Sequence, residues 1–303
     1  VKSVRVSVPA STSNLGPGFD CLGLALDLRN EMTVELHEGS GEPAVEIEGE
    51  GADSLPRGRE NLVVRAAQSV LAGRLEGRLV FRCVNRIPLA RGLGSSAAAA
   101  VAGVFAANAL FPRPVLTPEE CFEYATVLEG HPDNAAAAVY GGLMLSLKQG
   151  KRFMSYSLKT HADLAVVTLI PDFELKTSES RAAVPPTVLR GDAVDNIGRS
   201  SLLVAALGEG HWDRLPAATE DRIHQPYRAK FVPGFDDALK AARSAAPCGP
   251  ALSGAGPSLI ALCRKGAAAE AVKAAMSSAL ERHGVKHRAL VLAADSKGAR
   301  LSA

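Results

Sequence analysis

The stretch Pro88-Leu-Ala-Arg-Gly-Leu-Gly-Ser-Ser-Ala97 separates two segments with different predicted structures. Residues 79–87 (LVFRCVNRI) are rich in β-branched and aromatic side chains, which favours a strand. Residues 97–110 are mostly alanine, which favours a helix. Gly92 and Gly94 allow the backbone between them to turn sharply and to approach a ligand closely. The unpaired N–H groups and the positive dipole end of the helix then predict a phosphate-binding loop.

The residues at the start of this helix refine the prediction. Ser95 and Ser96 supply hydroxyl groups for phosphate oxygens or for Mg²⁺. The loop is not a Walker P-loop, because no Gly-Lys-Ser/Thr follows the glycines. A glycine-rich turn that only leads into a core helix is the alternative, because such turns are common. The other segments of the chain decide between the two.

The composition is that of a globular protein large enough for two domains. The chain has 303 residues, is 47% hydrophobic and 22% charged, and has a formal net charge of +2. The sequence contains no polybasic block or basic-aromatic stripe, so we expect no nucleic-acid partner. The most membrane-like segment, residues 97–111, is too short to span a bilayer, so we expect no membrane partner.

The cysteines and the first residues favour a cytoplasmic location. The five cysteines are scattered and form no Cys-x-x-Cys pair, which argues against a disulfide framework or a zinc site. The sequence opens on an alternating strand pattern at residues 3–8 and shows no secretory signal. We therefore expect a reducing compartment.

Strand and helix patterns alternate along the chain. The polar, basic segment 149–156 predicts the seam between two domains, 1–150 and 151–303. Thr117-Pro118-Glu119-Glu120 predicts a capped helix start, and the apolar run 164–170 predicts a strand buried on both faces. Mixed elements with some antiparallel strands predict an α+β fold. The other predicted helices cover 61–75, 197–207, 235–246 and 267–283, and the other strands cover 31–36, 143–148, 258–263 and 288–294.

Small polar residues and glycines are dense in Pro9–Gly23 (PASTSNLGPGFDCLG), directly after the first strand. Asn14 offers an amide, and Asp20 offers a carboxylate suited to a ligand ammonium or hydroxyl group. A capped turn is the alternative, because Asn, Gly, Pro and Asp dominate turns for local reasons. A second glycine-rich loop covers residues 248–257.

Glu123 and the segment Glu129-Gly-His-Pro-Asp-Asn134 form another candidate site. Glu123 lies off the apolar face of its predicted helix and has no basic partner one turn away. It could complete the coordination of Mg²⁺ together with a phosphate-loop serine, although a solvated glutamate is the commoner case. His131, Asp133 and Asn134 bring a donor, an acceptor and an amide together at a helix break.

Three arginines in the second half of the chain are candidates for binding an anionic group: Arg181, Arg222 and Arg228. A guanidinium can grip a carboxylate or phosphate through two parallel hydrogen bonds. The alternative is that each arginine is only a surface charge, so the case for a binding role depends on the other motifs.

Taken in order, three segments resemble the motifs of the GHMP kinase superfamily of small-molecule kinases. PASTSNLGPGFDCLG (9–23) resembles the first motif, PLARGLGSSA (88–97) the second and ALSGAGPS (251–258) the third. Within the superfamily, SNLGPGFDCLG, EGHPDN (129–134) and IHQPYR (223–228) are similar to the homoserine kinase family. The resemblance implies an N-terminal ATP-binding domain, a C-terminal ferredoxin-like α/β sandwich and often a homodimer.

The resemblance also implies ATP-dependent phosphorylation of the side-chain hydroxyl of L-homoserine, which gives O-phospho-L-homoserine for threonine biosynthesis. ATP and Mg²⁺ are the implied cofactors. The residues implied to wrap the ATP phosphates are Pro88, Leu89, Ala90, Arg91, Gly92, Leu93, Gly94, Ser95, Ser96, Ala97 and Ala98, with Asn61 at the adenosine part. Those implied to hold Mg²⁺ are Ser95 or Ser96 and Glu123. Those implied to surround the amino acid are Asn14, Asp20, His131, Asn134, Arg181 and Arg228.

The implied catalytic residues are Asn134, Arg181 and Asp133, but the proton acceptor stays open. Asp133 resembles in position the aspartate that some superfamily members use as a base. Homoserine kinases are often described as lacking an obvious base, with the phosphate itself taking the proton, and we favour this second view.

Two other functions compete with this interpretation. Another superfamily kinase, acting on mevalonate, a sugar or a diphosphocytidyl alcohol, often carries Pro-Ser-Gly where this chain has Gly130-His131-Pro132. The second competing function is a catalytically silent nucleotide-binding sensor of the same fold. The chain gives this function little support, because Glu123, Ser95, Ser96 and Asp133 are all present.

Overall fold

The computed structural model describes residues 2–75 and 77–302, and its first sheet is built around the long strand β2 (Gly18–His37). β2 pairs antiparallel with β1 (Lys2–Asn14) along most of its length. Its first part also pairs with β5 (Leu143–Gln149), and its last part pairs with β4 (Arg78–Asn85). The remaining strands of this sheet are β3 (Ala44–Gly49), β6 (Arg152–Leu158) and β11 (Arg300–Ser302).

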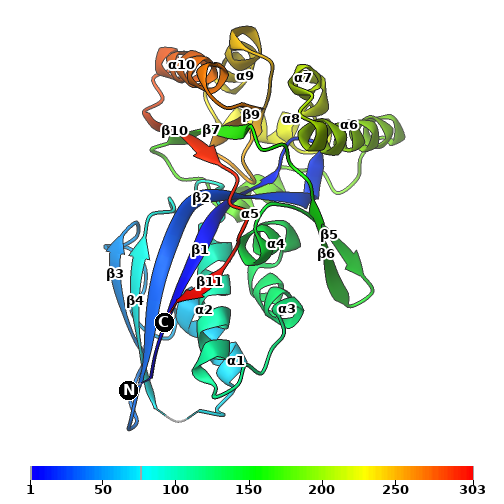
Figure 1. Cartoon of the computed structure of the whole chain (residues 1–303). Helices are drawn as coiled ribbons and strands as arrows, with labels where there is room; N and C mark the ends of the chain where they lie inside the picture. The colour runs from blue at the N-terminus through cyan, green and yellow to red at the C-terminus, as the bar shows by residue number, and fades with distance from the viewer. Residues whose placement is uncertain (1, 76, 303) are drawn as a thin grey trace.

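Four helices pack against this sheet: α1 (Leu62–Leu71), α2 (Ser95–Leu110), α3 (Pro118–Glu129) and α4 (Pro132–Tyr140) (Figure 1). The alanine-rich α2 is buried along most of its length, because its small side chains let neighbouring elements approach it closely. At Gly103, a side chain would begin only 2.5 Å from the Val63 carbonyl oxygen of α1. The helix predicted from the alanine-rich residues 97–110 is thus confirmed, and it lies in the core.

The predicted capping box at the start of α3 is confirmed. The Thr117 hydroxyl accepts a hydrogen bond from the Glu120 N–H at 3.2 Å, and the Glu120 carboxylate accepts one from the Thr117 N–H at 2.8 Å. Gly130 ends the helix in the left-handed conformation, and α4 begins two residues later at Pro132. This sharp helix-to-helix turn fixes the direction in which residues 129–134 project.

The second sheet has the strand order β10–β7–β9–β8, with every neighbouring pair antiparallel. Numbered along the chain, this order is 4-1-3-2, with helices after the first and third strands and a loop between the second and third, which is the ferredoxin-like arrangement. The predicted α+β fold and C-terminal ferredoxin-like sandwich are therefore confirmed. The strands are β7 (Leu164–Pro171), β8 (Cys248–Leu252), β9 (Leu259–Arg264) and β10 (His287–Ala293).

β7 is buried along its whole length, as its continuous apolar sequence predicts. Alternate residues face two layers: Val167 packs in the cluster with α9 (Phe235–Ala245) and α10 (Ala267–Arg282), and Val166 packs in the cluster that includes α6 (Arg190–Glu209). The short elements of this half are α5 (Thr177–Ala182), η1 (Trp212–Arg214), α7 (Leu215–Ala218), α8 (Gln225–Arg228) and η2 (Ala229–Phe231).

The sheets divide the chain differently from the predicted domains 1–150 and 151–303. The predicted seam lies inside the β5–β6 hairpin, so the first sheet continues to Leu158. β11 then returns from the C-terminal half and pairs with β1, with Leu301 opposite Val6. Residues 149–156, the predicted seam, thus lie in an edge hairpin whose polar composition resembles that of a linker, and the domain boundary itself stays a prediction.

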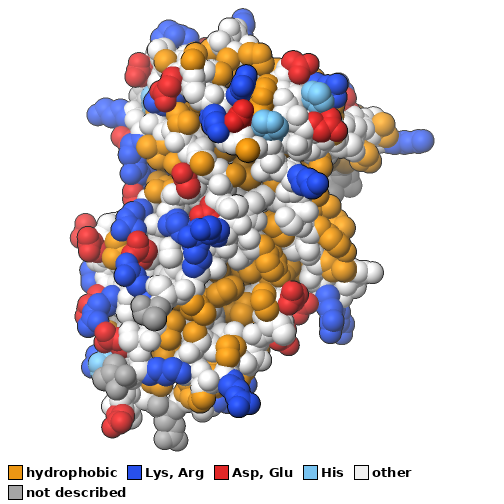
Figure 2. Space-filling view, viewed as in Figure 1, with side chains coloured by type: hydrophobic (Ala, Val, Ile, Leu, Met, Phe, Trp, Pro, Cys, Tyr) orange, Lys and Arg blue, Asp and Glu red, His pale blue; other side chains and the backbone are white. Residues whose placement is uncertain are grey.

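Three further properties of the described residues bear on the sequence predictions. Acidic and basic side chains are interspersed over the face shown in Figure 2. Within residues 2–75 and 77–302, no helix combines the length and the apolar character needed to cross a bilayer. All five cysteines are unpaired, and four of them are buried.

Candidate functional site

The loop between β4 and α2 is shaped as a cradle for an anion. Gly94 adopts the left-handed conformation (φ +68°) just before α2 and offers no side chain to cap the helix, so first-turn N–H groups are left for a ligand. A Cβ atom on Gly94 would overlap the Ser11 hydroxyl, and one on Gly92 (φ +72°) would overlap the Ser253 carbonyl. Both positions therefore require glycine, because neighbouring motifs press against this loop.

Hydrogen bonds join the three motifs that the sequence analysis singled out. The Ser253 hydroxyl donates to the Gly92 carbonyl oxygen at 2.6 Å. The Gly254 N–H donates to the Ser13 carbonyl oxygen at 3.1 Å, and the Asn14 amide donates back to the Gly254 carbonyl oxygen at 2.8 Å. Segments more than 200 residues apart in sequence thus form one wall of the site.

Two cavities meet at the start of α2. The first has a volume of about 460 Å³ and a mostly apolar lining, in which Leu89 is one of the apolar residues and Asn61 one of the polar ones. The second has a volume of about 100 Å³ and a polar lining. Both are lined by Ala90, Ser95 and Ser96, so the predicted phosphate loop forms their common wall. The predicted amino-acid and catalytic residues that line the second cavity are Asn14, Asp20, His131, Asp133, Asn134, Arg181 and Arg228.

The carboxylate beside the phosphate-loop serines is Glu129 and not Glu123. The Ser96 hydroxyl donates to Glu129 Oε2 at 2.6 Å, and both residues line the second cavity. Glu123 lies on another face of α3 and lines a separate apolar cavity with Phe122 and Tyr140. The structure therefore does not bring Glu123 to the site, which corrects the position predicted from the sequence.

A hydroxyl and a carboxylate at this place suit Mg²⁺. This ion prefers hard oxygen ligands, and it usually takes only one or two carboxylates from the protein while phosphates and water supply the rest. Within the described residues, no cluster of three or more His, Cys, Asp or Glu side chains could hold a metal by itself. The residues at the start of α2 thus fit a metal ion that arrives with a phosphate ligand.

The first turn of α4 presents Asn134 to the second cavity. Its side-chain oxygen accepts a hydrogen bond from the Ser11 hydroxyl at 2.9 Å, and its side-chain nitrogen donates to the Ser13 hydroxyl at 3.0 Å. Its N–H donates to the Asp133 carboxylate at 2.7 Å. His131 precedes the helix as the N-cap residue. Asn134 is therefore held in one orientation from both ends of its amide.

Asp20 and Arg181 form a two-point ion pair in the lining of the second cavity. Arg181 Nη2 lies 2.6 Å from Asp20 Oδ1, and Nη1 lies 3.2 Å from Oδ2. Both side chains are only partly buried, and each lines the cavity. Asp20 has a positive φ of +56°, and its N–H donates to the Asn14 side chain at 3.0 Å. The strained loop is thus held by the amide that the sequence predicted as a ligand-binding group.

Arg228 is a buried cation that lines the same cavity. Its side chain is 1% exposed, its Nε donates to the Ser180 carbonyl oxygen at 3.2 Å, and its Nη1 donates to the Gly254 carbonyl oxygen at 3.2 Å. Burial, and then the nearby Arg181 charge, lower the Arg228 pKa to about 10. Arg228 therefore stays protonated at neutral pH and offers positive charge to an anionic ligand.

Burial changes the proton affinity of three other residues that line the second cavity. It raises the pKa of Asp133 to about 6, against hydrogen bonds from the Asn134 N–H and the Ser13 side chain that favour the carboxylate. It raises the pKa of Glu129, which the Ser96 hydrogen bond partly opposes. It lowers the pKa of His131, and the Arg181 charge adds to this effect. His131 is therefore a neutral imidazole at pH 7.

Two residues of the predicted phosphate-binding segment, Arg91 and Ala97, contact other parts of the protein, although Arg91 also lines the second cavity. The Arg91 guanidinium donates to the carbonyl oxygens of Leu89 and Pro171, both at 2.8 Å, and so ties the loop to the end of β7. Ala97 is fully buried and lines neither cavity, because its side chain faces the core.

Sequence reasoning missed Ser13, Glu129 and Thr177 as residues that line the second cavity. Ser13 lies in the first motif and Glu129 in the EGHPDN segment, so both carried a signal that was not assigned to them. Thr177 begins α5 and carried no local signal.

Comparison with known proteins gives a consistent result. The sequence model of the GHMP kinases N terminal domain matches residues 61–142, and that of the GHMP kinases C terminal region matches residues 202–282. Homoserine kinase of Moorella thermoacetica is 44% identical over 296 residues, covering 97% of this chain and 98% of that protein. Homoserine kinase of Parasynechococcus marenigrum is 44% identical over 301 residues, covering 98% of this chain and 95% of that protein.

Solved structures share the fold. The crystal structure of homoserine kinase from Cytophaga hutchinsonii superposes with a TM-score of 0.90 at 29% identity, covering 100% of this chain and 98% of that chain. L. major mevalonate kinase in complex with R-mevalonate has a TM-score of 0.73 at 18% identity, covering 96% of each chain. This second match shows the fold alone.

Proposed function

Because the chain belongs to the homoserine kinase family of the GHMP kinases, we propose that it phosphorylates the side-chain hydroxyl of L-homoserine with ATP. The products are O-phospho-L-homoserine, a precursor in threonine biosynthesis, and ADP. The chain spans almost the full length of the homoserine kinases that it matches, so both domains that such a kinase uses are present.

The observation that carries this proposal is the meeting of two cavities at Ser95 and Ser96. Phosphoryl transfer needs little covalent chemistry from the protein and depends on positioning and on neutralising the charge of the transferred group. A nucleotide in the larger cavity and an acceptor alcohol in the smaller one would meet at the helix start. Direct in-line transfer then needs no covalent enzyme intermediate.

The larger cavity takes the nucleoside part of ATP, and the start of α2 takes its phosphates. Asn61 lines this cavity, but its side-chain oxygen accepts a hydrogen bond from the Val63 N–H at 3.0 Å and its side-chain nitrogen donates to the Pro56 carbonyl oxygen at 2.6 Å. Asn61 therefore shapes the wall of the adenosine site through these contacts. Ser95 or Ser96 and Glu129 would hold Mg²⁺, which neutralises phosphate charge when bound.

The smaller cavity takes the amino acid. Asp20 suits the ammonium group, and the Arg181 and Arg228 guanidinium groups suit the carboxylate. Asn14, His131 and Asn134 are polar groups that can orient the rest of the substrate and its hydroxyl. Binding requires the Asp20–Arg181 ion pair to share its charges with the two ionic groups of the substrate.

We assign the proton of the hydroxyl to the transferred phosphate and give Asp133 a positioning role. Asp133 is almost completely buried and receives a hydrogen bond from the Asn134 N–H, so it holds the turn that presents the Asn134 amide. Asn134 and Arg181 remain the candidate catalytic residues that touch the reacting groups.

A homodimer in the cytoplasm completes the proposal. The five free thiols suit a reducing compartment. Light scattering coupled to gel filtration tests the oligomeric state, and a mass of one chain at micromolar concentration would contradict the dimer.

The direct test is a comparison of acceptors. ADP release is measured with Mg²⁺ and ATP in the presence of L-homoserine, mevalonate or galactose, and the product is examined by ³¹P NMR. We expect ADP release only with L-homoserine, together with the signal of a phosphate monoester. Preference for mevalonate or galactose would assign another kinase activity, and ATP binding without turnover on any hydroxylated compound would favour a sensor.

A further inference from the structure

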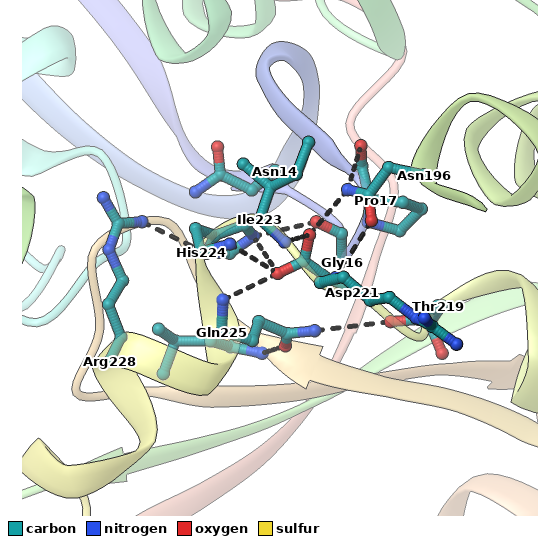
Figure 3. Close-up of polar contacts among 12 residues, drawn as sticks. Asn14, Gly16, Pro17, Asn196, Thr219, Asp221, Ile223, His224, Gln225 and Arg228 are labelled. Atoms are coloured by element: carbon teal, nitrogen blue, oxygen red, sulfur yellow. Dashed lines mark hydrogen bonds and ion pairs between the residues drawn. The ribbon is translucent and has the colours of Figure 1, made fainter. Parts of the chain in front are cut away.

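The segment Asp221–Arg228 forms a buried polar network, of which the proposed reaction uses only Arg228 (Figure 3). The Asp221 carboxylate accepts hydrogen bonds from the Asn196 amide at 2.6 Å, from the Ile223 N–H at 3.0 Å, from the His224 N–H at 2.9 Å and from the Gln225 N–H at 2.6 Å. Four donors on one carboxylate fix the start of α8 and with it the direction of the His224 side chain.

His224 is fully buried and joins the first motif to Arg228. Its Nε2 lies 2.8 Å from the Gly16 carbonyl oxygen, and its Nδ1 lies 3.2 Å from Arg228 Nη1. A guanidinium can only donate and a carbonyl can only accept, so the ring must be neutral, with the proton on Nε2. Burial lowers the pKa of His224, which agrees with this neutral form.

Phe19 closes the same cluster. Its ring stacks on the His224 ring with centroids 5.1 Å apart and an angle of 17°, and the Arg228 guanidinium lies 5.2 Å from its centroid. The loop that carries Asn14 and Asp20 is therefore packed against α8 through an aromatic ring as well as through the Gly16 carbonyl.

The remaining donors of Arg228 are directed by these contacts. Nε is bonded to Ser180, and Nη1 is shared between Gly254 and His224. Among the described residues, the hydrogen bonds of the Arg228 side chain come from Nε and Nη1 and none comes from Nη2. Arg228 also lines the second cavity. Fixing Nε and Nη1 in a planar fork leaves Nη2 as the group offered to an anionic ligand.

We propose that His224, held by Asp221, is a positioning residue that aims the Arg228 guanidinium at the carboxylate of the amino-acid substrate. This inference rests on the proposed function and adds two residues to it. His224 accepts from Arg228 through Nδ1 and at the same time anchors the Gly16 loop through Nε2. One neutral imidazole thus sets the distance between the groups that bind the two charged ends of the substrate.

The test separates the two nitrogens of His224. In H224N, the amide oxygen can occupy the place of Nδ1 and still accept from Arg228. In H224Q, the amide nitrogen can occupy the place of Nε2 and donate to Gly16, but no acceptor is left for Arg228. Because a hydrogen bond to a charged group contributes about 1.5–3 kcal/mol, we expect H224Q to raise the KM for L-homoserine by ~10–100-fold. H224N should raise it by less than ~5-fold.

A double-mutant cycle supplies a readout that a purely structural role would not move. In an R228A background, adding H224Q should change the KM for L-homoserine by less than ~2-fold, because the contact is already lost. The KM for ATP should stay within ~3-fold in all variants, and H283Q, at an exposed histidine, serves as the control.

Three results would overturn the proposal while wild-type activity on L-homoserine remains intact. They are equal KM values in H224Q and H224N, a multiplied defect in the double mutant, and a parallel rise in the KM for ATP with a lowered unfolding temperature. Absence of wild-type activity on L-homoserine would instead overturn the proposed function.

Discussion

Replacing Asp133 by asparagine should stabilise the protein at neutral pH. Asp133 is 2% exposed, and burial raises its pKa from the ordinary value of 3.8 to about 6. In the unfolded chain the carboxyl group regains its ordinary pKa. Above about pH 6 the group is charged in both states, and burying that charge opposes folding. As the pH falls through about 4, the group becomes protonated in the unfolded chain as well, and the effect is lost.

The size of the effect follows from the two pKa values. Each pKa unit corresponds to about 1.4 kcal/mol, so wild-type Asp133 lowers the free energy of unfolding by about 3 kcal/mol above pH 7. The amide of D133N has nearly the same shape, and its oxygen can still accept from the Asn134 N–H. We therefore expect D133N to be more stable than wild type by up to about 3 kcal/mol at pH 8, with the difference falling below about 1 kcal/mol near pH 4.

The assay is urea unfolding of wild type and D133N between about pH 4 and 8, followed by circular dichroism. A stability difference that is independent of pH, or a less stable variant at pH 8, would refute the reasoning. The same variant tests the proton acceptor. We expect its kcat to stay within about tenfold of wild type, whereas loss of a general base lowers turnover by about 10²–10⁴-fold. A thousandfold loss with unchanged substrate binding would identify Asp133 as the base.

Three more variants test the assignment of the site. E129Q should raise the Mg²⁺ concentration for half-maximal activity at least about tenfold, because Glu129 contacts Ser96. E123Q, the matched control on the same helix, should leave that concentration unchanged. Activity is measured against the concentration of free Mg²⁺, and a larger effect of E123Q would restore Glu123 as the ligand. G92A should raise the KM for ATP and lower the unfolding temperature, because the φ of +72° and the neighbouring Ser253 carbonyl leave no room for a methyl group. Wild-type values in both assays would contradict the assignment of this loop as the phosphate-binding cradle. D20N should raise the KM for L-homoserine by about 10–100-fold and leave that for ATP within about threefold, since it removes the partner of Arg181; an equal rise in both KM values would show a general loss of structure.

Local sequence signals predicted the glycine turn before α2 and the elements around it well. The glycines, the alanine helix, the capping box before α3 and the buried strand β7 all depend on residues close together in the chain. Such features follow from backbone sterics, capping hydrogen bonds and apolar patterning. They also place most of the site, because the motifs lie at the ends of these elements.

The choice between Glu123 and Glu129 was beyond local reasoning. The two residues lie six positions apart on one helix, so they project in different directions. Which of them meets Ser96 depends on how α3 packs beside α2, and helical spacing alone does not determine that packing.

Two of the strands that the sequence analysis did not predict are β8 and β11, and each escaped prediction for a physical reason. β8 contains Gly249 and Pro250, which are typical of a loop, but β8 is the last strand of its sheet, where a proline can be tolerated. β11 has only three residues and forms by pairing with β1 at the opposite end of the chain. Pairing over such a distance leaves no trace in the local pattern.

The most direct test of the account is a crystal structure of the protein with a non-hydrolysable ATP analogue, Mg²⁺ and L-homoserine. The account predicts the terminal phosphate at the N–H groups that open α2, with the substrate hydroxyl facing it from the smaller cavity and the substrate carboxylate on Arg181 and Arg228. A triphosphate bound away from Ser95 and Ser96, or an amino acid outside the smaller cavity, would contradict it.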